Sequence, residues 1–551
     1  MRFKQQISTR LAFGAAAALA VCLSASDRQV FASEQQGAQP PAGQLPVSGQ
    51  APVVQPPATP APLGSGPELR LTADEAVRLA LENNLGVQSA RLEPQIGTYQ
   101  VAEARGAFVP NLFSTTQTRS ATSPPDFFAS GGSADATTSE RFQTNFGVQQ
   151  QVPWGGGRYA VSLDASRQTV NYTSSFNPQL GSNLLAQYTQ PLLRNFLIDA
   201  SRQQVMLARK NEEIADLQLR QQLTTTERAV RNAYYDLIGA LGQLDVTRQS
   251  LELSQRSLRD NERRVEVGTM AQIDILEAQA EVARNEEAVI IAEANIKSFE
   301  DILRTLILNP QQPDFWSARL VPTERPTLTP QPVDVDAAIQ NALANRTDIL
   351  QARKRLESSQ ITIDYSRNQK LPDLNLIANY NTVGIAGTAF EFGQGFPPPV
   401  LNQSQRSFSD ALRDVFGNDF KTWSVQLQLN YPIGTSQADA SLASARLERE
   451  QELNQMRDLQ TLVTAGVRDA GRQVSTSLQR VEATRKARDF AERRLEAENK
   501  RVTVGLSTTF QMFQAQRDLD SARQNELRAL IDYNRSLVNF TAVQQAPLQG
   551  R

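Results

Sequence analysis

Carboxylate chemistry is what the composition of this sequence leaves open. The 551 residues include no histidine and a single cysteine, Cys22. Without histidine, Ser-His-Asp catalysis, Cys-His catalysis and His-ligated metal sites are excluded. Cys22 lies in an apolar run at the N-terminus, so a mature chain that lacks this run has no disulfide, no thiolate metal site and no thiol nucleophile.

The acidic residues do not form a pattern that is typical of an enzyme. A carboxylate enzyme such as a glycosidase needs two acids paired in a shaped pocket, whereas most acids here lie on long predicted helices. We therefore expect no enzymatic activity, no cofactor and no metal. The 56 Lys and Arg residues face 58 Asp and Glu residues, which leaves no basic excess for binding a nucleic-acid backbone.

The N-terminal segment 1–32 is typical of an export signal. The stretch Leu11–Leu23 is apolar throughout, and it is too short to span a bilayer. Three basic residues precede it, namely Arg2, Lys4 and Arg10. Cleavage is expected after Ala25 or after Ala32, because small residues favour it there. The sequence therefore predicts export from a bacterial cytoplasm.

The same region leaves a lipoprotein open and predicts a spacer. Acylation of Cys22 would make a lipoprotein, although Val21 stands where a small residue is expected. The segment 33–68 includes nine prolines between Pro40 and Pro67, which predicts a disordered, partly polyproline II linker. Beyond the signal, no apolar run approaches the ~18 residues of a spanning helix. If the chain enters a membrane, we expect it to do so as strands.

The remainder of the chain consists of two copies of one sequence repeat. The segment Thr72–Asn83 matches Asp334–Asn345, and Arg264–Gly268 matches Arg501–Gly505. Thr72 and Asp334 lie farther apart in the sequence than Arg264 and Arg501 do, so the first copy is the longer one. We assign three parts on this basis: a first helix–strand–helix repeat (69–331), a second repeat (332–545) and a C-terminal tail (546–551).

Each copy contains a long helix whose apolar residues recur every seven positions. The first-copy row is Leu223, Val230, Leu237, Leu244, Leu251, Leu258 and Val265, and the second copy keeps five of seven apolar in the same register. A seven-residue period predicts helices that supercoil along a seam. Small residues three positions further on permit close helix approach: Thr226, Ala233, Ala240, Thr247 and Ser254.

The helices are expected to form a long rod. Two long helices, about 203–264 and 439–501, should each extend roughly 90 Å at 1.5 Å per residue. Shorter helices should return in two end-to-end pairs, 270–308 with 334–370 and 508–545 with 72–107. Thr72 and Glu75 form a capping box that begins the first helix. The segment 309–332 contains six prolines and should form an irregular belt at mid-height.

The segments between the helices alternate as strands do. Trp423, Val425, Leu427, Leu429 and Tyr431 are interleaved with polar residues, and the two aromatics bracket about 26 Å of strand. This length matches a membrane β-barrel with aromatic girdles and a polar lumen. A soluble sandwich with one wet face is the alternative. Export, few strands per chain and a Gln/Asn-rich polar face favour the barrel.

The number of strands stays open at this stage. In the first copy, Gly155-Gly156-Gly157 is a turn signal, and the alternation resumes after it. The first copy could therefore have four strands, which gives six per chain and a wider barrel, or the segment 120–182 could be an elaborate loop. We favour additional strands. The segment 383–420 of the second copy is predicted to be a long external loop.

The two copies resemble the TolC family of outer-membrane efflux channels, or outer membrane factors, over residues 69–545. The paired Arg-Val-x-Val-Gly blocks, each followed by Ala-Gln, carry most of this resemblance. It implies a mainly α fold with membrane strands: a homotrimer whose long antiparallel coiled-coil helices form an α-barrel continuous with an outer-membrane β-barrel.

The resemblance also implies a function. The protein would be a passive exit duct in the outer membrane, extending into the periplasm, of a tripartite efflux or type I secretion system. The expected partners are outer-membrane lipid, a periplasmic adaptor and an inner-membrane pump of the RND or ABC type. Trp423 and Tyr431 would be its membrane-interface aromatics.

The hairpin turns are the expected adaptor contacts. They are Val267-Gly268-Thr269 and Val504-Gly505-Leu506, where glycine allows the positive φ of a helix end. A helix cap alone would explain both glycines. The resemblance implies more, namely contact with the helical hairpins of a periplasmic adaptor.

The resemblance also points to a gate near these turns. Gln511 and Gln514 stand where the family has aspartates, so an acidic cation-binding ring there is in doubt. The first copy has Asp274 and Glu277 at the corresponding places. Six such carboxylates in a trimer would favour cation entry if they face inward. We expect Asp274 to line or latch the constriction, whereas a solvated position on the helix surface explains Glu277 better.

A periplasmic coiled-coil adaptor or scaffold is the alternative function. Such adaptors have one helical hairpin flanked by β-rich domains. Here two long hairpins alternate with strand segments, which disfavours this alternative. A simple dimeric coiled coil would explain the heptads but not the strands.

Overall fold

The computed structural model describes residues 68–124, 136–268, 271–311, 315–325, 328–395, 398–504 and 506–547. These residues belong to one compact unit. The predicted export signal and nearly all of the predicted linker lie outside the described residues, as do Thr269 and Gly505 of the turns.

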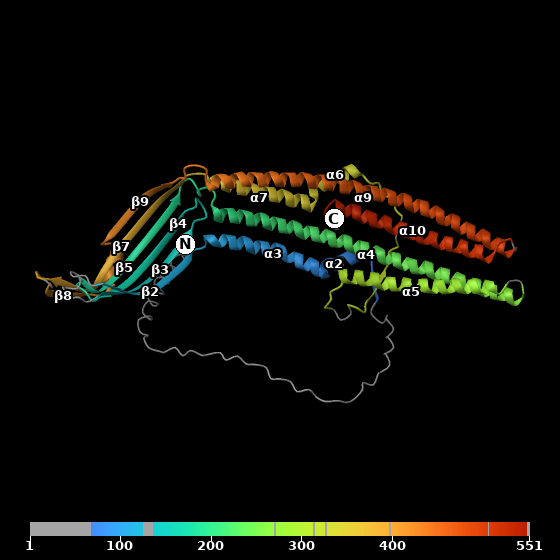
Figure 1. Cartoon of the computed structure of the whole chain (residues 1–551), viewed down its shortest axis with the longest axis horizontal. Helices are drawn as coiled ribbons and strands as arrows, with labels where there is room; N and C mark the ends of the chain where they lie inside the picture. The colour runs from blue at the N-terminus through green and yellow to red at the C-terminus, as the bar shows by residue number, and fades with distance from the viewer. Residues whose placement is uncertain are drawn as a thin grey trace, which may run out of the picture. The chain divides into compact units, whose positions relative to one another are not determined.

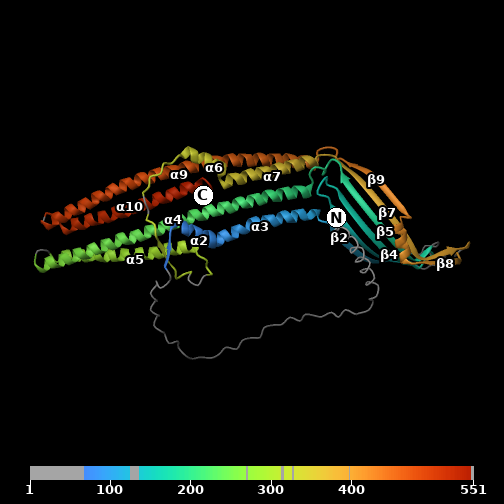
Figure 2. The ribbon, with the colours of Figure 1, turned by 180° about the vertical axis from the view of Figure 1, so that it is seen from behind.

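Two helices of 67 residues each run along this unit (Figure 1). They are α4 (Ala200–Glu266) and α9 (Gln437–Thr503). The shorter helices are α2 (Ala73–Asn83), α3 (Leu85–Arg105), α5 (Ile273–Ile307), α6 (Val335–Asn345), α7 (Thr347–Gln369) and α10 (Thr509–Val543). In the half nearest the sheet the helices lie in the order α3, α4, α7, α9, and in the far half in the order α5, α4, α10, α9 (Figure 2).

The helices begin where side chains satisfy their free N–H groups. Thr72 and Glu75 form a capping box at α2, as predicted. Ser436 and Asp439 form another at α9, and the Asp199 carboxylate accepts from the third backbone N–H of α4. Each cap satisfies donors that the helix itself cannot pair.

The close helix approach predicted from the small residues is confirmed. All five small residues beside the first-copy heptad row are at most 8% exposed, whereas Val230 and Leu237 are the only members of the apolar row that are equally buried. Gly242 of α4 lies against Leu527 of α10, and a Cβ there would lie 2.9 Å from a Leu527 methyl carbon. The seam therefore runs along the small residues, because they let the backbones approach.

The end-to-end pairing of the shorter helices differs from the prediction. The Asn84 amide, between α2 and α3, donates to the Leu306 carbonyl at the end of α5 (3.2 Å). Arg346, between α6 and α7, donates to the Val543 carbonyl at the end of α10 (2.8 Å). Hence α3 continues α5 and α7 continues α10, and the predicted pairs 270–308 with 334–370 and 508–545 with 72–107 are wrong. Each short helix stays beside the long helix of its own copy, because that is where its apolar partners lie.

A seven-stranded antiparallel sheet closes one end of the helical layer (Figure 1). Its strands are β2 (Asn111–Ser123), β3 (Thr137–Gln151), β4 (Arg158–Val170), β5 (Phe176–Pro191), β7 (Asp373–Phe392), β8 (Val400–Arg406) and β9 (Lys421–Asn430). They follow the order β2-β3-β4-β5-β7, and β7 then pairs β9 along its first half and β8 along its second. The additional strands of the first copy are confirmed, and the alternative of a loop over 120–182 is wrong.

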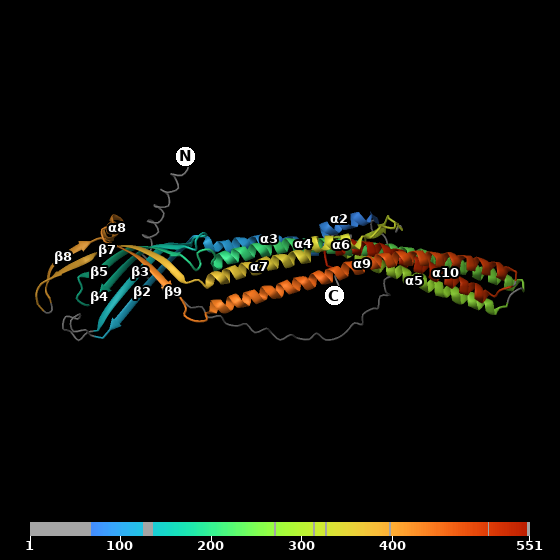
Figure 3. The ribbon, with the colours of Figure 1, turned by 90° about the horizontal axis from the view of Figure 1, so that it is seen from above.

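The second-copy insert is not the long external loop that we predicted for 383–420. β7 continues through it to Phe392, β8 returns beside β7, and α8 (Phe408–Gly417) packs on β5 and β7 (Figure 3). Asp410 completes a capping box with Ser407, and Asn418 ends α8 with a φ of 64°. The sequence did not show these elements because cross-strand pairing, not local alternation, holds β8 in place.

A short parallel pair lies at mid-height. β1 (Glu68–Leu71) pairs with β6 (Arg319–Pro322), so the predicted belt over 309–332 includes one strand. The Tyr234 hydroxyl of α4 donates to the Leu71 carbonyl (3.1 Å). The largest core cluster lies beneath, where α2 covers α4 and the end of α5.

Candidate functional site

The sheet register gathers apolar side chains on one face. Because side chains alternate along a strand, directly opposed residues share a face. The pairs on this face include Phe146 with Leu163, Leu163 with Leu184, Tyr159 with Tyr188, Tyr188 with Ala378, Tyr380 with Trp423, and Leu376 with Leu427. Trp423, Val425, Leu427 and Leu429 are each 61–70% exposed, so the chain itself leaves this apolar belt largely uncovered on β9.

The opposite face is lined mainly by uncharged polar side chains. Its pairs include Gln143 with Ser166, Gln187 with Asn379, Asn379 with Ser424, and Asn375 with Gln428. The Asn379 amide donates to the Ser424 hydroxyl across the strands (3.3 Å). Among the paired strands this face also carries a few charged residues, namely Arg119, Arg141, Arg158, Asp164 and Asp373. The sheet therefore separates an apolar surface from an amide-rich one.

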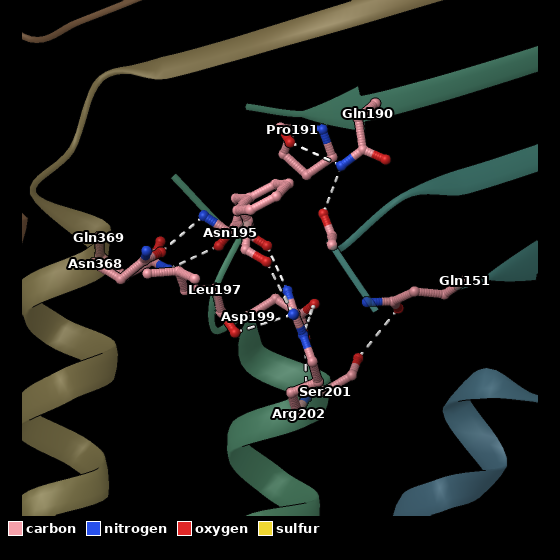
Figure 4. Close-up of polar contacts among 12 residues, drawn as sticks. Gln151, Gln190, Pro191, Asn195, Leu197, Asp199, Ser201, Arg202, Asn368 and Gln369 are labelled. Carbon is pink, nitrogen blue, oxygen red and sulfur yellow. Dashed lines mark hydrogen bonds and ion pairs between the residues drawn. The ribbon is translucent and has the colours of Figure 1, made fainter. Parts of the chain in front are cut away.

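A polar network joins the sheet to α4 (Figure 4). The Arg202 guanidinium donates to the carbonyls of Asn195 (2.5 Å) and Phe196 (2.9 Å) and to the Asp199 carboxylate (2.8 Å). Asn195 has a φ of 65°, and its backbone N–H donates to Asn368 of α7 (2.7 Å). Since Arg202 and Asp199 are both largely buried, this network fixes the bend where the chain leaves β5 and enters α4.

The additional hairpin docks into the same network. Gly156, in the turn between β3 and β4, has a φ of 69°, and a Cβ there would overlap the Asn195 carbonyl oxygen. The Gln190 amide donates to the Gly155 carbonyl (2.6 Å). Sequence analysis identified this glycine turn but missed Arg202. The Asp199-x-x-Arg202 spacing at the start of a helix is the signal that could have found it.

The turns at the far end of α4 and α9 expose apolar side chains. Val267 is 77% exposed, Val504 67% and Leu506 79%. Gly268 has a φ of 81°, the conformation predicted for a helix end.

Of the four candidate gate residues, one forms a contact between the two hairpins. The Asp274 carboxylate of α5 accepts from the Thr509 hydroxyl of α10 (3.1 Å). Gln511 belongs to the capping box of α10, and Gln514 donates to Asp518 one turn further along α10 (3.0 Å). Glu277 is exposed on the surface of α5, which is where a solvated acid would lie.

Sequence analysis missed a second link between α5 and α10. The Glu281 carboxylate is 6% exposed and accepts from Arg517 of α10 (3.0 Å) and from Arg284 (2.8 Å). Because this carboxylate is almost fully removed from solvent, removing either arginine would leave its charge only partly paired. The sequence offers no direct signal for this link, because a contact between α5 and α10 depends on tertiary packing.

One half-buried acid, Asp520, lies in the seam between α4 and α10. Burial raises the pKa of Asp520, against a hydrogen bond from the Ser250 hydroxyl (2.6 Å) that lowers it. No first-copy acid corresponds to it, because residue 283 of α5 is alanine.

Neither a metal cluster nor an apolar spanning helix is found in the described ranges. No group of three or more acidic or sulfur-bearing side chains is placed to hold a metal ion there. Within the same residues, every helix is too short or too polar to cross a membrane.

The long helical layer ending in an antiparallel sheet is a fold shared with solved outer-membrane channel structures. CusC, whose crystal structures concern transmembrane channel formation, has a TM-score of 0.61 at 15% identity, covering 90% of this chain and 99% of CusC. The outer-membrane channel OprN has a TM-score of 0.60 at 16% identity, covering 86% of this chain and 89% of OprN. Both likenesses establish the fold.

Sequence comparison identifies the family of the chain. The outer membrane efflux protein family matches residues 158–307 and 338–543, so the chain belongs to this family and is an outer membrane efflux protein. Outer membrane protein TolC of Escherichia coli (strain K12) is 23% identical over 386 residues, which cover 68% of this chain and 72% of TolC.

Proposed function

We propose that three copies of this chain form one passive conduit through the outer membrane and on into the periplasm. The open sheet is the observation that carries this proposal. Within the described residues, the outer edge of β2 and the outer edge of β9 have no neighbouring strand. Since every backbone polar group in a bilayer needs a partner, these edges must pair with further copies. A closed ring satisfies each edge with one repeated contact.

The sheet dimensions suit a wide, water-filled barrel. Six strands (β2, β3, β4, β5, β7 and β9) are long, and the shortest of them, β9, has 10 residues. Strands of this length can cross a bilayer. Three copies of six make eighteen, a number that leaves an aqueous channel. The amide-rich face would line this channel and the apolar face would meet lipid. Trp423 and Tyr431 would mark the two membrane interfaces.

The helical layer offers matching edges for the same assembly. Apolar side chains remain exposed on its outermost helices: Leu92, Tyr99 and Ile290 on α3 and α5, and Leu447, Leu462 and Phe490 on α9. Contact between one copy's α9 and the next copy's α3 and α5 would cover both sets. Three layers closed in this way make an α-barrel that continues the β-barrel.

The hairpin turns are the proposed docking points for a periplasmic adaptor. Val267, Val504 and Leu506 are exposed beyond the last helical contacts, and apolar side chains so placed favour burial against a partner. The proposed contact includes Gly268 and extends to Thr269 and Gly505. An inner-membrane pump of the RND or ABC type would supply the energy.

The proposed gate lies just behind these turns. The Asp274–Thr509 hydrogen bond joins the two hairpins of one chain, so it must break if the hairpins separate. Glu277, Gln511 and Gln514 are proposed to line the aperture. Because two of these three are uncharged, the second-copy side of the aperture would select weakly between cations and anions.

Planar-bilayer conductance tests this function with a matched pair of variants. We expect the purified protein to give discrete conductance steps. Val425→Asp with Leu427→Asp places two charges on the lipid face of β9 and should abolish insertion. Gln426→Asp with Gln428→Asp places the same charges on the other face of the same strand and should leave conducting channels. Folded protein that never conducts, or two double variants that behave alike, would contradict the proposal.

A further inference from the structure

Helix α8 lies on the apolar face of the sheet. A Cβ at Gly384 of β7 would overlap the carbonyl oxygen of Ala411 in α8. Gly384 shares its face with Tyr380, because side chains two or four positions apart on a regular strand point to the same side. Tyr380 also forms a side-chain hydrogen bond with Asn418, which ends α8. The helix therefore covers the surface that the proposed function assigns to lipid.

The sheet beneath α8 is built from small residues. Ser182, Thr382 and Ala386 share the face of Gly384 and are at most 2% exposed. Val425, farther along the same face, is 61% exposed. This small-residue patch therefore leaves room for a helix to pack closely on the sheet. The rest of the face keeps large apolar side chains, which suit contact with lipid.

Polar contacts fix α8 on this small-residue patch of the sheet. Both oxygens of the Asp414 carboxylate accept from Arg406 (2.9 and 2.8 Å), and Arg406 also donates to the Ile385 carbonyl (3.0 Å). After the helix, the Val383 backbone N–H donates to the Phe420 carbonyl (3.1 Å). Hydrogen bonds between charged groups are stronger than neutral ones, so the arginine–carboxylate contact holds α8 in one position.

The side of α8 that faces away from the sheet carries both aromatic and charged side chains. Phe416 is 68% exposed and Arg413 is exposed beside it, and Phe420 is 61% exposed just beyond the helix. The small-residue patch begins just past the Tyr380–Trp423 pair. Trp423 lies at the end of β9 away from α9, so in the proposed function it marks the membrane interface on the side away from the helices. Phenylalanine beside arginine is the composition of helices that lie in a headgroup layer.

We infer that α8 is an interfacial helix on the outer wall of the barrel, with Phe416 and Phe420 inserted among the lipids of the outer leaflet. The inference rests on the proposed function, because it takes the apolar face to be the lipid face. The exposed side of α8 lies on the same face of the sheet as the exposed apolar belt of β9. For this reason we infer that lipid, and not protein, contacts α8. Neither sheet edge is occupied by α8, so edge pairing between copies leaves room for it.

Site-directed spin labelling can test this inference, because Cys22 is the only native cysteine. In a Cys22→Ser background, a nitroxide is attached at Phe416→Cys, Leu427→Cys or Gln426→Cys, and each protein is placed in phosphatidylcholine nanodiscs. Collision with oxygen reports lipid, and collision with nickel ethylenediaminediacetate reports water. We expect labels 416 and 427 to favour oxygen severalfold relative to label 426.

The outcomes separate the inference from the proposed function. If label 427 favours oxygen and label 416 behaves like label 426, α8 lies in water and the inference fails. If neither reagent reaches label 416, protein covers it and the inference also fails. If label 427 itself behaves like label 426, the sheet does not face lipid and the proposed function fails. Gly384→Val should displace α8, which would raise the mobility of label 416 and leave label 427 unchanged.

Discussion

The two copies of the repeat agree closely in their helices and differ in their sheets. The long helices have 67 residues in both copies, the hairpin partners 35, and the first short helices 11. The first copy, by contrast, contributes four strands to the sheet, and the second contributes β7, β8 and β9 with α8 between them. Helix length is therefore fixed more tightly than strand number.

Their geometry accounts for this difference. All helices of one layer must reach the same two ends, so an insertion in one would shift its heptad register against every neighbour. A sheet can take an additional antiparallel hairpin without moving the strands already paired. The excess length of the first copy lies in its sheet segment, and the turn of the added hairpin docks on the Arg202 network.

The same comparison extends to the joints between short helices. Asn84 and Arg346 occupy equivalent places in the two copies, each directly after the first short helix, and both donate to the carbonyl end of another helix. The first copy uses a neutral amide and the second a buried cation paired with Asp348. The copies thus share the geometry of this joint and not its chemistry.

The largest expected effect comes from Gly156, and Gly434, a second positive-φ glycine near the start of a long helix, is its counterpart in the second copy. Gly156→Ala in the first copy adds a Cβ that would overlap the Asn195 carbonyl oxygen, so we expect the folded protein to be lost. Gly434→Ala in the second copy has a φ of 107° and meets no atom within 4 Å, so only backbone strain of about 1 to 3 kcal/mol remains. Yields of folded protein after detergent extraction compare the two. Equal yields would contradict a docked first-copy turn.

The equivalent joints should differ next most strongly. Arg346→Ala leaves the Asp348 carboxylate half-buried without its cation, which should lower the free energy of unfolding by about 2 to 3 kcal/mol. Asn84→Ala loses neutral hydrogen bonds and should cost about 1 kcal/mol. Denaturant unfolding followed by circular dichroism measures both. A larger loss for Asn84→Ala would show that the cation is not the stronger joint.

The two copies should also differ in the pH dependence of stability, because α10 has Asp520 in its seam with α4 whereas α5 has alanine at the equivalent position. Burial raises the pKa of Asp520, so the folded state holds this proton more tightly than the unfolded state and is destabilised once the carboxyl ionises. Asp520→Asn keeps an acceptor for Ser250 and should raise the melting temperature by about 1 to 2 °C at pH 7. The gain should shrink as the pH falls to 4, because the folded state then increasingly holds the carboxyl protonated.

Asp439 provides the control of opposite sign. The Lys370 ammonium and the Ser436 cap lower its pKa to about 2, so the ionised form stabilises the fold above the ordinary aspartate pKa, and this stability is lost as the pH falls towards 2. Asp439→Asn should therefore lower the melting temperature at pH 7. A gain for Asp520→Asn that is the same at pH 4 and pH 7 would refute the role of charge.

The smallest effect on stability is expected at the candidate gate, where the effect on function should be larger. Asp274→Ala removes one hydrogen bond to Thr509 and should change the free energy of unfolding by about 0.5 kcal/mol. It should nevertheless increase the open fraction of single channels, because it removes a link between the hairpins. Glu286→Ala, at an exposed acid farther along α5 and outside the proposed aperture, is the matched control. Identical open fractions in both variants and the parent would exclude Asp274 as a latch.

The helices were predictable because their signals are local. Heptads, the Thr72–Glu75 box and the repeated Val-Gly blocks each identify an element within a short stretch of sequence. Pairing was not predictable in this way. Asn84 contacts Leu306, which is distant in the sequence. Helix α8 packs closely on Gly384, a residue with no side chain to suggest a partner. The sheet face was foreseen strand by strand, whereas Arg202 and the link between Glu281 and Arg517 emerged from tertiary contacts.

Mass and location, measured together, test the central claim most directly. Inner and outer membranes are separated on a density gradient, the protein is extracted in detergent, and light scattering gives the mass of the protein in the complex. Three sheets joined edge to edge predict a trimer in the outer-membrane fraction. A monomer or dimer in the soluble periplasmic fraction would contradict the barrel and leave the heptads as an ordinary coiled-coil scaffold.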